Sequence, residues 1–312
     1  MSRHKQFKVT RLKDYPLESR PSKVSIEDFS SPAADATLQG LLDSFPKILA
    51  AAEFRTPVER IRQARVGGKA IIWGFGGHLV KVGLAPVLID LLNRGFVTAM
   101  ATNGSGMIHD FEIAIEGRTS EEVEEQLETG AFGMARETGD FLNRAIIEGA
   151  ERGAGIGESV GDSLETRGAK HAELSLLLQA HRRGVPLSVL VAMGTDTIFN
   201  HPSASGEAIG KGSQIDFHIF AQQVSLLDEG GVYLNVGSAV ILPEVFLKAV
   251  SLVRNSGRKL NNFTTANLDF IQHYRPTRNV VERPVAAGGT GIAITGHHEI
   301  MIPLLAAALV HG

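Results

Sequence analysis

The stretch KAIIWGFGGH at residues 69–78 decides the fold, because an apolar run stops there at a glycine-rich turn. Its first part, 69–73, predicts a short strand that is buried on both faces. The segment that follows, LVKVGLAPVLIDLLNRG at 79–95, predicts a helix that ends at Gly95, a typical helix C-cap. A buried strand, a tight turn and a helix in this order form the opening unit of a parallel sheet.

The same alternation continues along the rest of the chain. A helical segment precedes it at 38–54, where Pro46 is expected to kink or divide the helix. Further buried strands are predicted at 96–102, 186–194, 232–239, 259–267 and 291–296. Helical patterns lie between or after them at 120–153, 171–184, 213–231, 242–257 and 298–310. We therefore predict an α/β fold, a Rossmann-like and mostly parallel sheet of about six strands with helices on both faces.

Composition excludes several classes of protein. The 312 residues include no cysteine, which excludes disulfide scaffolds, thiolate zinc sites and cysteine nucleophiles. The net charge of −3 makes a nucleic-acid partner a poor fit. The N-terminus has no apolar signal segment, and no apolar run approaches the roughly 18 residues of a membrane span. The expected location is the cytoplasm, with no membrane partner.

The first 35 residues differ from the rest. Residues 1–23 carry seven basic and two acidic side chains, and prolines punctuate the stretch to residue 35. We expect an extended arm over 1–35, either solvated or lying on a neighbouring subunit, and a single α/β domain over 36–312.

The loops after the predicted strands are where a ligand is expected, because open parallel sheets bind ligands beyond the carboxyl ends of their strands. Small, polar and histidine residues gather in each of these loops: 74–78, 102–106, 194–201, 235–239, 264–269 and 295–299. The turn at 74–77 has backbone N–H groups suited to a phosphate. It is not a G-x-G-x-x-G motif, however, and Thr102 and Asn103 stand where a ribose-binding acid would follow the second strand.

Two hydrolytic alternatives also arise from the residues. Histidines late in the chain lie near carboxylates, which is compatible with a metallo-hydrolase, although no set of metal ligands is assigned. His297 and His298 are adjacent and cannot share a helix face as an i, i+4 pair does. A Ser–His–Asp hydrolase is disfavoured because no G-x-S-x-G motif is present.

Seven short blocks, in order, resemble the deoxyhypusine synthase family over residues 60–310. They are IIWGFGGHLVKVG, MATNGSGMIHDFE, GAFGMARETGDFLNR, GTDTIFNHP, YLNVGSAVILPEV, TTANLD and GHHEIMIPLLAAALV. In the second block Thr102, Gly106 and Asp110 match the family pattern, and His109 replaces a glutamate. The resemblance implies a Rossmann-like fold, a homotetramer, NAD as cofactor and a small-molecule amine such as spermidine as substrate.

The resemblance also implies a set of site residues. Asp196 and His201 are the expected catalytic pair, with histidine suited to proton transfer near neutral pH. Carboxylates suit a cationic amine, and the candidates are Asp269, Glu299 and Glu244. The cofactor-binding candidates are Gly76, Gly77, His78, Thr102, Asn103, Gly104, Gly237, Ser238, Asp269, His297 and His298.

One departure from the family limits the predicted reaction. The family forms an imine on a lysine in a Trp-Gly-Lys block near the C-terminus, but here the last lysine is Lys259 and the only tryptophan is Trp73. We therefore expect NAD-dependent amine oxidation or aminoalkyl transfer to a free polyamine-type molecule, and not deoxyhypusine synthesis. Whether the chain is an enzyme stays open. The alternatives are a non-catalytic nucleotide-binding protein of the same fold and the His/carboxylate metallo-hydrolase.

Overall fold

The centre of the molecule is one six-stranded parallel sheet. The computed structural model describes residues 2–311. Its strands are β1 (Ile71–Phe75), β2 (Ala99–Thr102), β3 (Leu187–Val189), β4 (Val232–Val236), β5 (Phe263–Asp269) and β6 (Gly289–Thr295). The strand order is β3-β2-β1-β4-β5-β6, and every neighbouring pair is parallel. The prediction of a Rossmann-like α/β fold is confirmed.

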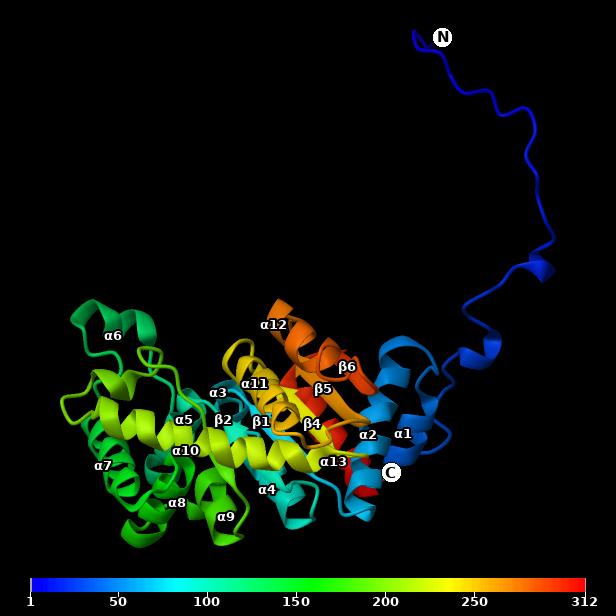
Figure 1. The fold of residues 1–312 in the computed structure, drawn as a ribbon. Helices are drawn as coiled ribbons and strands as arrows, with labels where there is room; N and C mark the ends of the chain where they lie inside the picture. The colour runs from blue at the N-terminus through cyan, green and yellow to red at the C-terminus, as the bar shows by residue number, and fades with distance from the viewer. Residues whose placement is uncertain (1, 312) are drawn as a thin grey trace.

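Thirteen helices surround this sheet within the described residues. They are α1 (Leu38–Ser44), α2 (Leu49–Val66), α3 (Gly77–Lys81), α4 (Ala85–Asn93), α5 (Gly104–Glu116), α6 (Val123–Thr129), α7 (Arg136–Arg152), α8 (Ile156–Arg167), α9 (Leu176–Arg182), α10 (Gly206–Val224), α11 (Ile241–Asn255), α12 (Tyr274–Pro276) and α13 (His298–His311). Figure 1 shows α7, α8 and α9 gathered at the β3 end of the sheet and α1 and α2 at the β6 end.

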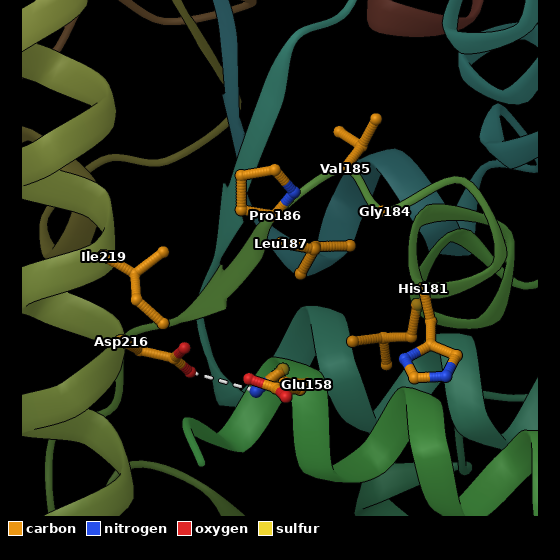
Figure 2. Close-up of a pocket in the computed structure, with 10 residues that line it drawn as sticks. Glu158, His181, Gly184, Val185, Pro186, Leu187, Asp216 and Ile219 are labelled. Atoms are coloured by element: carbon orange, nitrogen blue, oxygen red, sulfur yellow. Dashed lines mark hydrogen bonds between the residues drawn. The ribbon is translucent and has the colours of Figure 1, made fainter.

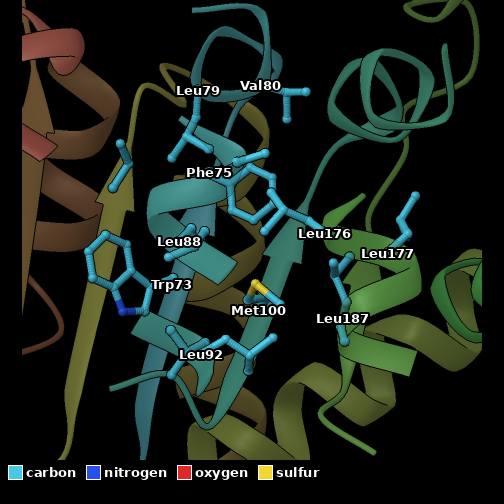
Figure 3. Packing of buried hydrophobic residues seen from close by; sticks show 14 of the residues in the cluster. Trp73, Phe75, Leu79, Val80, Leu88, Leu92, Met100, Leu176, Leu177 and Leu187 are labelled. Carbon is cyan, nitrogen blue, oxygen red and sulfur yellow. The ribbon is translucent and has the colours of Figure 1, made fainter. Parts of the chain in front are cut away.

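The core has two layers because successive side chains of each strand point to opposite faces. On one face, Trp73 and Phe75 of β1 pack with Leu88 of α4 in a large apolar cluster (Figure 3). On the other face, Tyr233 of β4 stacks on Phe246 of α11 with ring centroids 3.8 Å apart. Each fully buried large side chain contributes about 1.5–3 kcal/mol to folding. The sheet therefore forms a rigid base for the loops at its ends.

Glycines divide two helices that the sequence pattern predicts as continuous. The predicted helix 79–95 is split into α3 and α4, with Gly83 at φ +78° between them. The predicted helix 120–153 is split into α6 and α7, with Gly130 and Gly133 both at φ +75°. A positive φ cannot continue a right-handed helix. The division expected at Pro46 is found, since α1 ends at Ser44 and α2 begins at Leu49.

The N-terminal segment lies outside the packed body. Residues 2–35 are almost entirely exposed and contain only two single-turn 3-10 helices, at Leu17–Ser19 and Ile26–Asp28. Figure 1 shows this arm leaving the body beside α1 and extending into solvent. It carries large apolar side chains, and Phe7 and Ile26 are 93% and 82% exposed. Its placement on a neighbouring subunit stays a prediction. Within residues 2–311, no helix is long and apolar enough to cross a bilayer.

Candidate functional site

The strand order places a topological switch point between β1 and β4. Chain connections run outward from these two strands in opposite directions, which leaves a crevice beyond their carboxyl ends in folds of this type. The loops after β1 and β4 meet there, and the backbone N–H of Gly76 donates to the carbonyl of Val236 at 3.0 Å. The predicted cofactor loops therefore do converge at one edge of the sheet.

Glycine is required where these loops meet. A Cβ on Gly76 would lie 2.3 Å from the carbonyl oxygen of Gly237, and one on Gly77 would lie 2.2 Å from Oγ of Ser105. Gly237 has φ +62°, a conformation that side-chain-bearing residues rarely adopt. The glycines let the loops after β1, β2 and β4 approach one another backbone to backbone.

A buried histidine lies beneath the switch point. His298, the first residue of α13, is fully buried, and its Nε2 lies 3.0 Å from the carbonyl oxygen of Leu268 and 4.0 Å from Oδ1 of Asp269. Because a carbonyl only accepts, Nε2 donates to it, and in the neutral imidazole Nδ1 is then an acceptor. Nδ1 is buried and has no hydrogen-bond partner among the described residues. A buried acceptor without a donor is costly, so this nitrogen is a polar atom that the described residues leave unsatisfied.

Three more rings surround His298. His78 of α3 lies edge-on to it at 5.4 Å between centroids, and Phe270 lies 5.9 Å from His78. The exposed ring of His297 stacks on Phe270 at 6.2 Å. Burial, and next the nearby His298, lower the pKa of His78. His78 is therefore a neutral hydrogen-bonding group near pH 7, and the cluster presents flat rings beside the loops.

The end of β2 is tied to its neighbours by polar side chains. Oγ1 of Thr102 donates to the carbonyl of Phe75 at 2.9 Å, which links β2 to β1. Oδ1 of Asn103 accepts from the N–H of Gly106 at 3.0 Å and so caps α5. Gly104 faces the Asp196 carboxylate, which would lie 2.3 Å from a Cβ there. The N-terminus of α5 thus already has an anion beside it, namely Asp196.

Asp196 lines a small cavity between α5 and the segment that carries α6. The cavity measures about 160 Å³ and is lined by Ser105, Ile108, His109, Glu112, Ser120, Glu121, Phe132, Thr195, Asp196 and Thr197. Its volume is below the roughly 300–1,000 Å³ of hollows that hold drug-sized ligands, so it suits a small molecule or the end of a longer one. Asp196 is 7% exposed; burial raises the pKa of its carboxyl, against hydrogen bonds from Thr195 and the Ser105 backbone.

The second carboxylate of the cavity, Glu112, is held by hydroxyl groups. Oγ1 of Thr119 donates to its Oε2, and Oγ1 of Thr138 donates to its Oε1 at 3.2 Å. Burial opposes ionisation of Glu112, but the imidazole of His109, whose Nδ1 lies 3.9 Å from Oε2, and the hydrogen bonds from Thr119 and Thr138 outweigh it and lower the pKa. Glu112 is therefore an anion near neutral pH. Together with Asp196 it gives the cavity a negative character.

Several predicted site residues are placed elsewhere or are already paired. Nδ1 of His201 lies 2.8 Å from Oγ of Ser203 and 3.7 Å from Asp140, and His201 is not among the residues lining the cavity. Glu244 on α11 forms ion pairs with Lys248 and Arg275. Oγ of Ser238 accepts from the N–H of Leu242, in the first turn of α11, at 3.2 Å.

Glu299 lies at the start of α13, close to the ring cluster and to solvent. Its Oε1 lies 3.8 Å from Nδ1 of His297, and its side chain is 49% exposed. Screening by water weakens such a pair, so it stabilises the fold little. Of the three carboxylates expected to bind an amine, Asp269 alone is buried at the switch point.

Sequence reasoning missed most of the cavity. The helix α5 was not predicted, because the loop 103–106 with its two glycines looked like a turn and nothing more. Ser105, His109 and Glu112 have spacings of i, i+4 and i+7 within GSGMIHDFE, which place them on one helix face. That spacing is the signal that predicts them once residues 104–116 are recognised as a helix.

A second hollow lies at the opposite edge of the sheet. It measures about 350 Å³ beside the amino end of β3, and Figure 2 shows Glu158 and His181 across it from Asp216. Oδ2 of Asp216 accepts from the N–H groups of Gly157 at 3.0 Å and Val189 at 2.8 Å. Since this carboxylate joins α8 to β3, its role is structural.

Asp216 makes the stability of the fold depend on pH. Burial raises its pKa to about 7 despite hydrogen bonds from Gly157, Val189 and Ile156. The folded chain then binds this proton more tightly than the unfolded chain, so the free energy of unfolding decreases as pH rises towards 7, by up to about 1.4 kcal/mol per pH unit. Burial also raises the pKa of Asp110, to about 6, and the pKa of Asp196. An ordinary histidine titrates near pH 6.5 as well, so the contribution of Asp216 is measured as a difference: in urea unfolding between pH 6 and 7, Asp216→Asn should show a flatter slope than the natural protein. An equal slope in the variant would contradict the prediction.

Among residues 2–311, no three histidine, aspartate or glutamate side chains are arranged as ligands of a metal ion. The fold and the strand order define a Rossmann-like α/β protein with a topological switch point at the carboxyl ends of β1 and β4, the position where folds of this class bind ligands.

Comparisons with known proteins agree with this class. No family model and no curated protein sequence matches the chain. A putative deoxyhypusine synthase from Entamoeba histolytica has a similar structure, with 11% identity and a TM-score of 0.52 over 87% of this chain and 92% of that one. A conserved putative LOR/SDH protein from Methanococcus maripaludis S2 is 14% identical with a TM-score of 0.54, over 94% of this chain and 74% of that one. The fold expected from the deoxyhypusine synthase resemblance is confirmed.

A third similar structure contains ligands. It is the ternary complex of AgrE with ornithine and NAD⁺, which is 12% identical with a TM-score of 0.53, over 84% of this chain and 34% of that one. The chain thus spans about a third of the length of AgrE. These low identities establish a shared fold and no particular activity.

Proposed function

We propose that the chain binds NAD at the switch point and acts on a small amine, by oxidation or by transfer of an aminoalkyl group to a second amine. The observation that carries this proposal is the contact between Gly77 and Ser105, which puts the loop after β1 directly beside the cavity lined by Asp196. A site for a dinucleotide and a site for a cation are then neighbours. The ternary complex of AgrE with ornithine and NAD⁺, part of whose chain has a similar fold, supports the pairing.

The residues at the switch point fit a dinucleotide. The glycine loops leave backbone close to any ligand there, and the buried Nδ1 of His298 lacks a donor. Asp269, 3% exposed at the end of β5, is the proposed acceptor for ribose hydroxyls. His78, His297 and Phe270 supply flat surfaces. NAD, when bound, accepts a hydride from a carbon next to nitrogen.

The residues of the cavity fit an ammonium group. Asp196 and Glu112 are carboxylates in a partly enclosed space, where an ion pair is stronger than in open water. Phe132 lines the same cavity and provides apolar contact for methylene groups. A diamine or polyamine offers both an ammonium end and a methylene chain.

The Asp269→Asn variant tests the cofactor half. A hydrogen bond to a charged acceptor contributes about 1.5–3 kcal/mol, so we expect NAD to bind roughly 10- to 100-fold more weakly. Isothermal titration with NAD measures this directly. Asp90→Asn is the matched control, because Asp90 is exposed on α4 and its carboxylate pairs with Arg94 at 2.8 Å. Unchanged affinity in Asp269→Asn would remove Asp269 from the site.

Incubation with NAD and putrescine, spermidine or agmatine tests the reaction itself. NADH fluorescence and a new amine or aldehyde product are the expected results. NAD binding without any amine-dependent NADH would favour the non-catalytic nucleotide-binding alternative. Stoichiometric zinc or manganese in the purified protein, with no NAD binding, would favour the metallo-hydrolase.

A further inference from the structure

A chain of hydrogen bonds runs from Glu112 through Thr119 to His109 in the wall of the cavity. Oγ1 of Thr119 donates to Oε2 of Glu112, and the same oxygen lies 2.7 Å from Nδ1 of His109. His109 and Glu112 are one helical turn apart on α5, and Thr119 follows that helix. A carboxylate, a hydroxyl and an imidazole are thus aligned in series.

This series fixes which nitrogen of His109 carries the proton. A hydroxyl has one hydrogen to donate, and Thr119 donates it to Glu112. An ionised carboxylate can accept hydrogen bonds but cannot donate one. Thr119 must therefore accept from His109, so Nδ1 is the protonated nitrogen. In the neutral imidazole, Nε2 is then left with its lone pair.

The free nitrogen belongs to the cavity. Nε2 of His109 has no hydrogen-bond partner in the described part of the chain. The buried polar side-chain atoms that lack a partner do not include this nitrogen. His109 lines the cavity together with Asp196, and its Cδ2, next to Nε2, would lie 3.1 Å from a Cβ on Gly77. The imidazole of His109 thus lies between the cavity and the loop after β1.

We infer that His109 is a catalytic base that takes the proton from an ammonium group held by Asp196, with Thr119 and Glu112 as positioning residues. The inference rests on the proposed function and gives it a proton acceptor. It replaces His201 in that role, since the partners of His201 are Ser203 and Asp140.

The step balances as a proton transfer. An N–H bond of the ammonium breaks, its electron pair stays on nitrogen as the amine lone pair, and the proton forms a bond to Nε2 of His109. The resulting imidazolium is stabilised through Thr119 by the negative charge of Glu112. The free lone pair is what an amine needs before a hydride can leave its α-carbon to an oxidant such as NAD.

The tautomer of His109 is testable without any ligand. Long-range ¹H–¹⁵N NMR of imidazole-labelled protein at high pH, with His109 assigned by its absence in His109→Gln, distinguishes Nδ1–H from Nε2–H. We expect Nδ1–H in the natural protein and a shift towards Nε2–H in Thr119→Val, which keeps the shape and removes the hydroxyl. Nε2–H in the natural protein would overturn the inference.

Steady-state kinetics with NAD and the best of the three amines test the role in turnover. General base catalysis contributes roughly 10²–10⁴-fold, so His109→Gln should lower kcat at least about 100-fold with little change in the amine KM. Thr119→Val should lower kcat less. If the natural protein oxidises an amine and His109→Gln does so equally fast, the role of His109 is refuted and the proposed function stands. If the natural protein oxidises none of the amines, both are refuted.

Discussion

Replacing Asp196 with asparagine should raise the KM for an amine substrate by roughly 30-fold or more, because removing one partner of a buried charge pair costs about 2–5 kcal/mol. Asp196 is 7% exposed and lines the cavity next to Ser105, so water cannot replace it freely around an ammonium group. Asparagine has nearly the same shape and keeps an oxygen for Thr195 or the Ser105 backbone. The expected loss is therefore in electrostatic attraction and not in packing.

The measurement is the NADH-forming rate against amine concentration, together with urea unfolding of each variant. Glu128→Gln is the control, because it removes one negative charge from exposed α6 outside the cavity. It should leave KM unchanged. A rise in KM shared by both variants would mean that overall charge attracts the amine, and an unchanged KM in Asp196→Asn would remove Asp196 from the site.

Replacing Gly76 with alanine should destabilise the whole fold. The new Cβ would lie 2.3 Å from the carbonyl oxygen of Gly237, and that atom belongs to backbone that is itself hydrogen-bonded to β5. Overpacking of this kind costs about 1–3 kcal/mol. We expect a value at the upper end, because no flexible side chain can move aside, and we expect NAD binding to weaken as the loops separate.

The control for this variant is Gly210→Ala. Gly210 is exposed in the second turn of α10, and no heavy atom lies within 4 Å of a Cβ added there. Alanine there should stabilise the protein by about 0.5–1 kcal/mol, since glycine is a poor helix former. Urea midpoints should thus move in opposite directions. A Gly76→Ala variant as stable as the natural protein would show that the two loops are free to move apart.

The layout of the sheet could be predicted from the sequence because its signal is strong and local. Each strand is a short apolar run such as IIW at 71–73, and each is separated from the next by helical periodicity. Helix breaks were missed because Gly83, Gly130 and Gly133 act through a positive φ, which sequence alone does not distinguish from a tolerated helical glycine. The strand order could not be predicted, because it depends on packing between segments that are distant in the sequence.

Only the part of the site formed by the loops at the carboxyl ends of the strands could be predicted from the sequence. The loops after β1, β2 and β4 were expected from strand ends, and the structure brings Gly76 and Gly237 into contact there. The partners of His201 and Glu244 could not be predicted, because Ser203, Asp140 and Arg275 reach them by turns and helix packing that no short pattern encodes. The sequence shows His109 as a residue that differs from the family block. Its hydrogen-bonded link to Glu112 through Thr119 becomes apparent only in the three-dimensional structure.

The backbone-to-backbone contact of Gly76 with Gly237 divides the site into a fixed half and an adjustable half. Any side chain added in the first half disturbs the sheet, so natural or laboratory diversification has little freedom there. The segment from Ser120 to Phe132 contributes residues to the cavity wall and is mostly exposed to solvent. Libraries that test the proposed amine specificity should therefore vary that segment and leave the glycine turns intact.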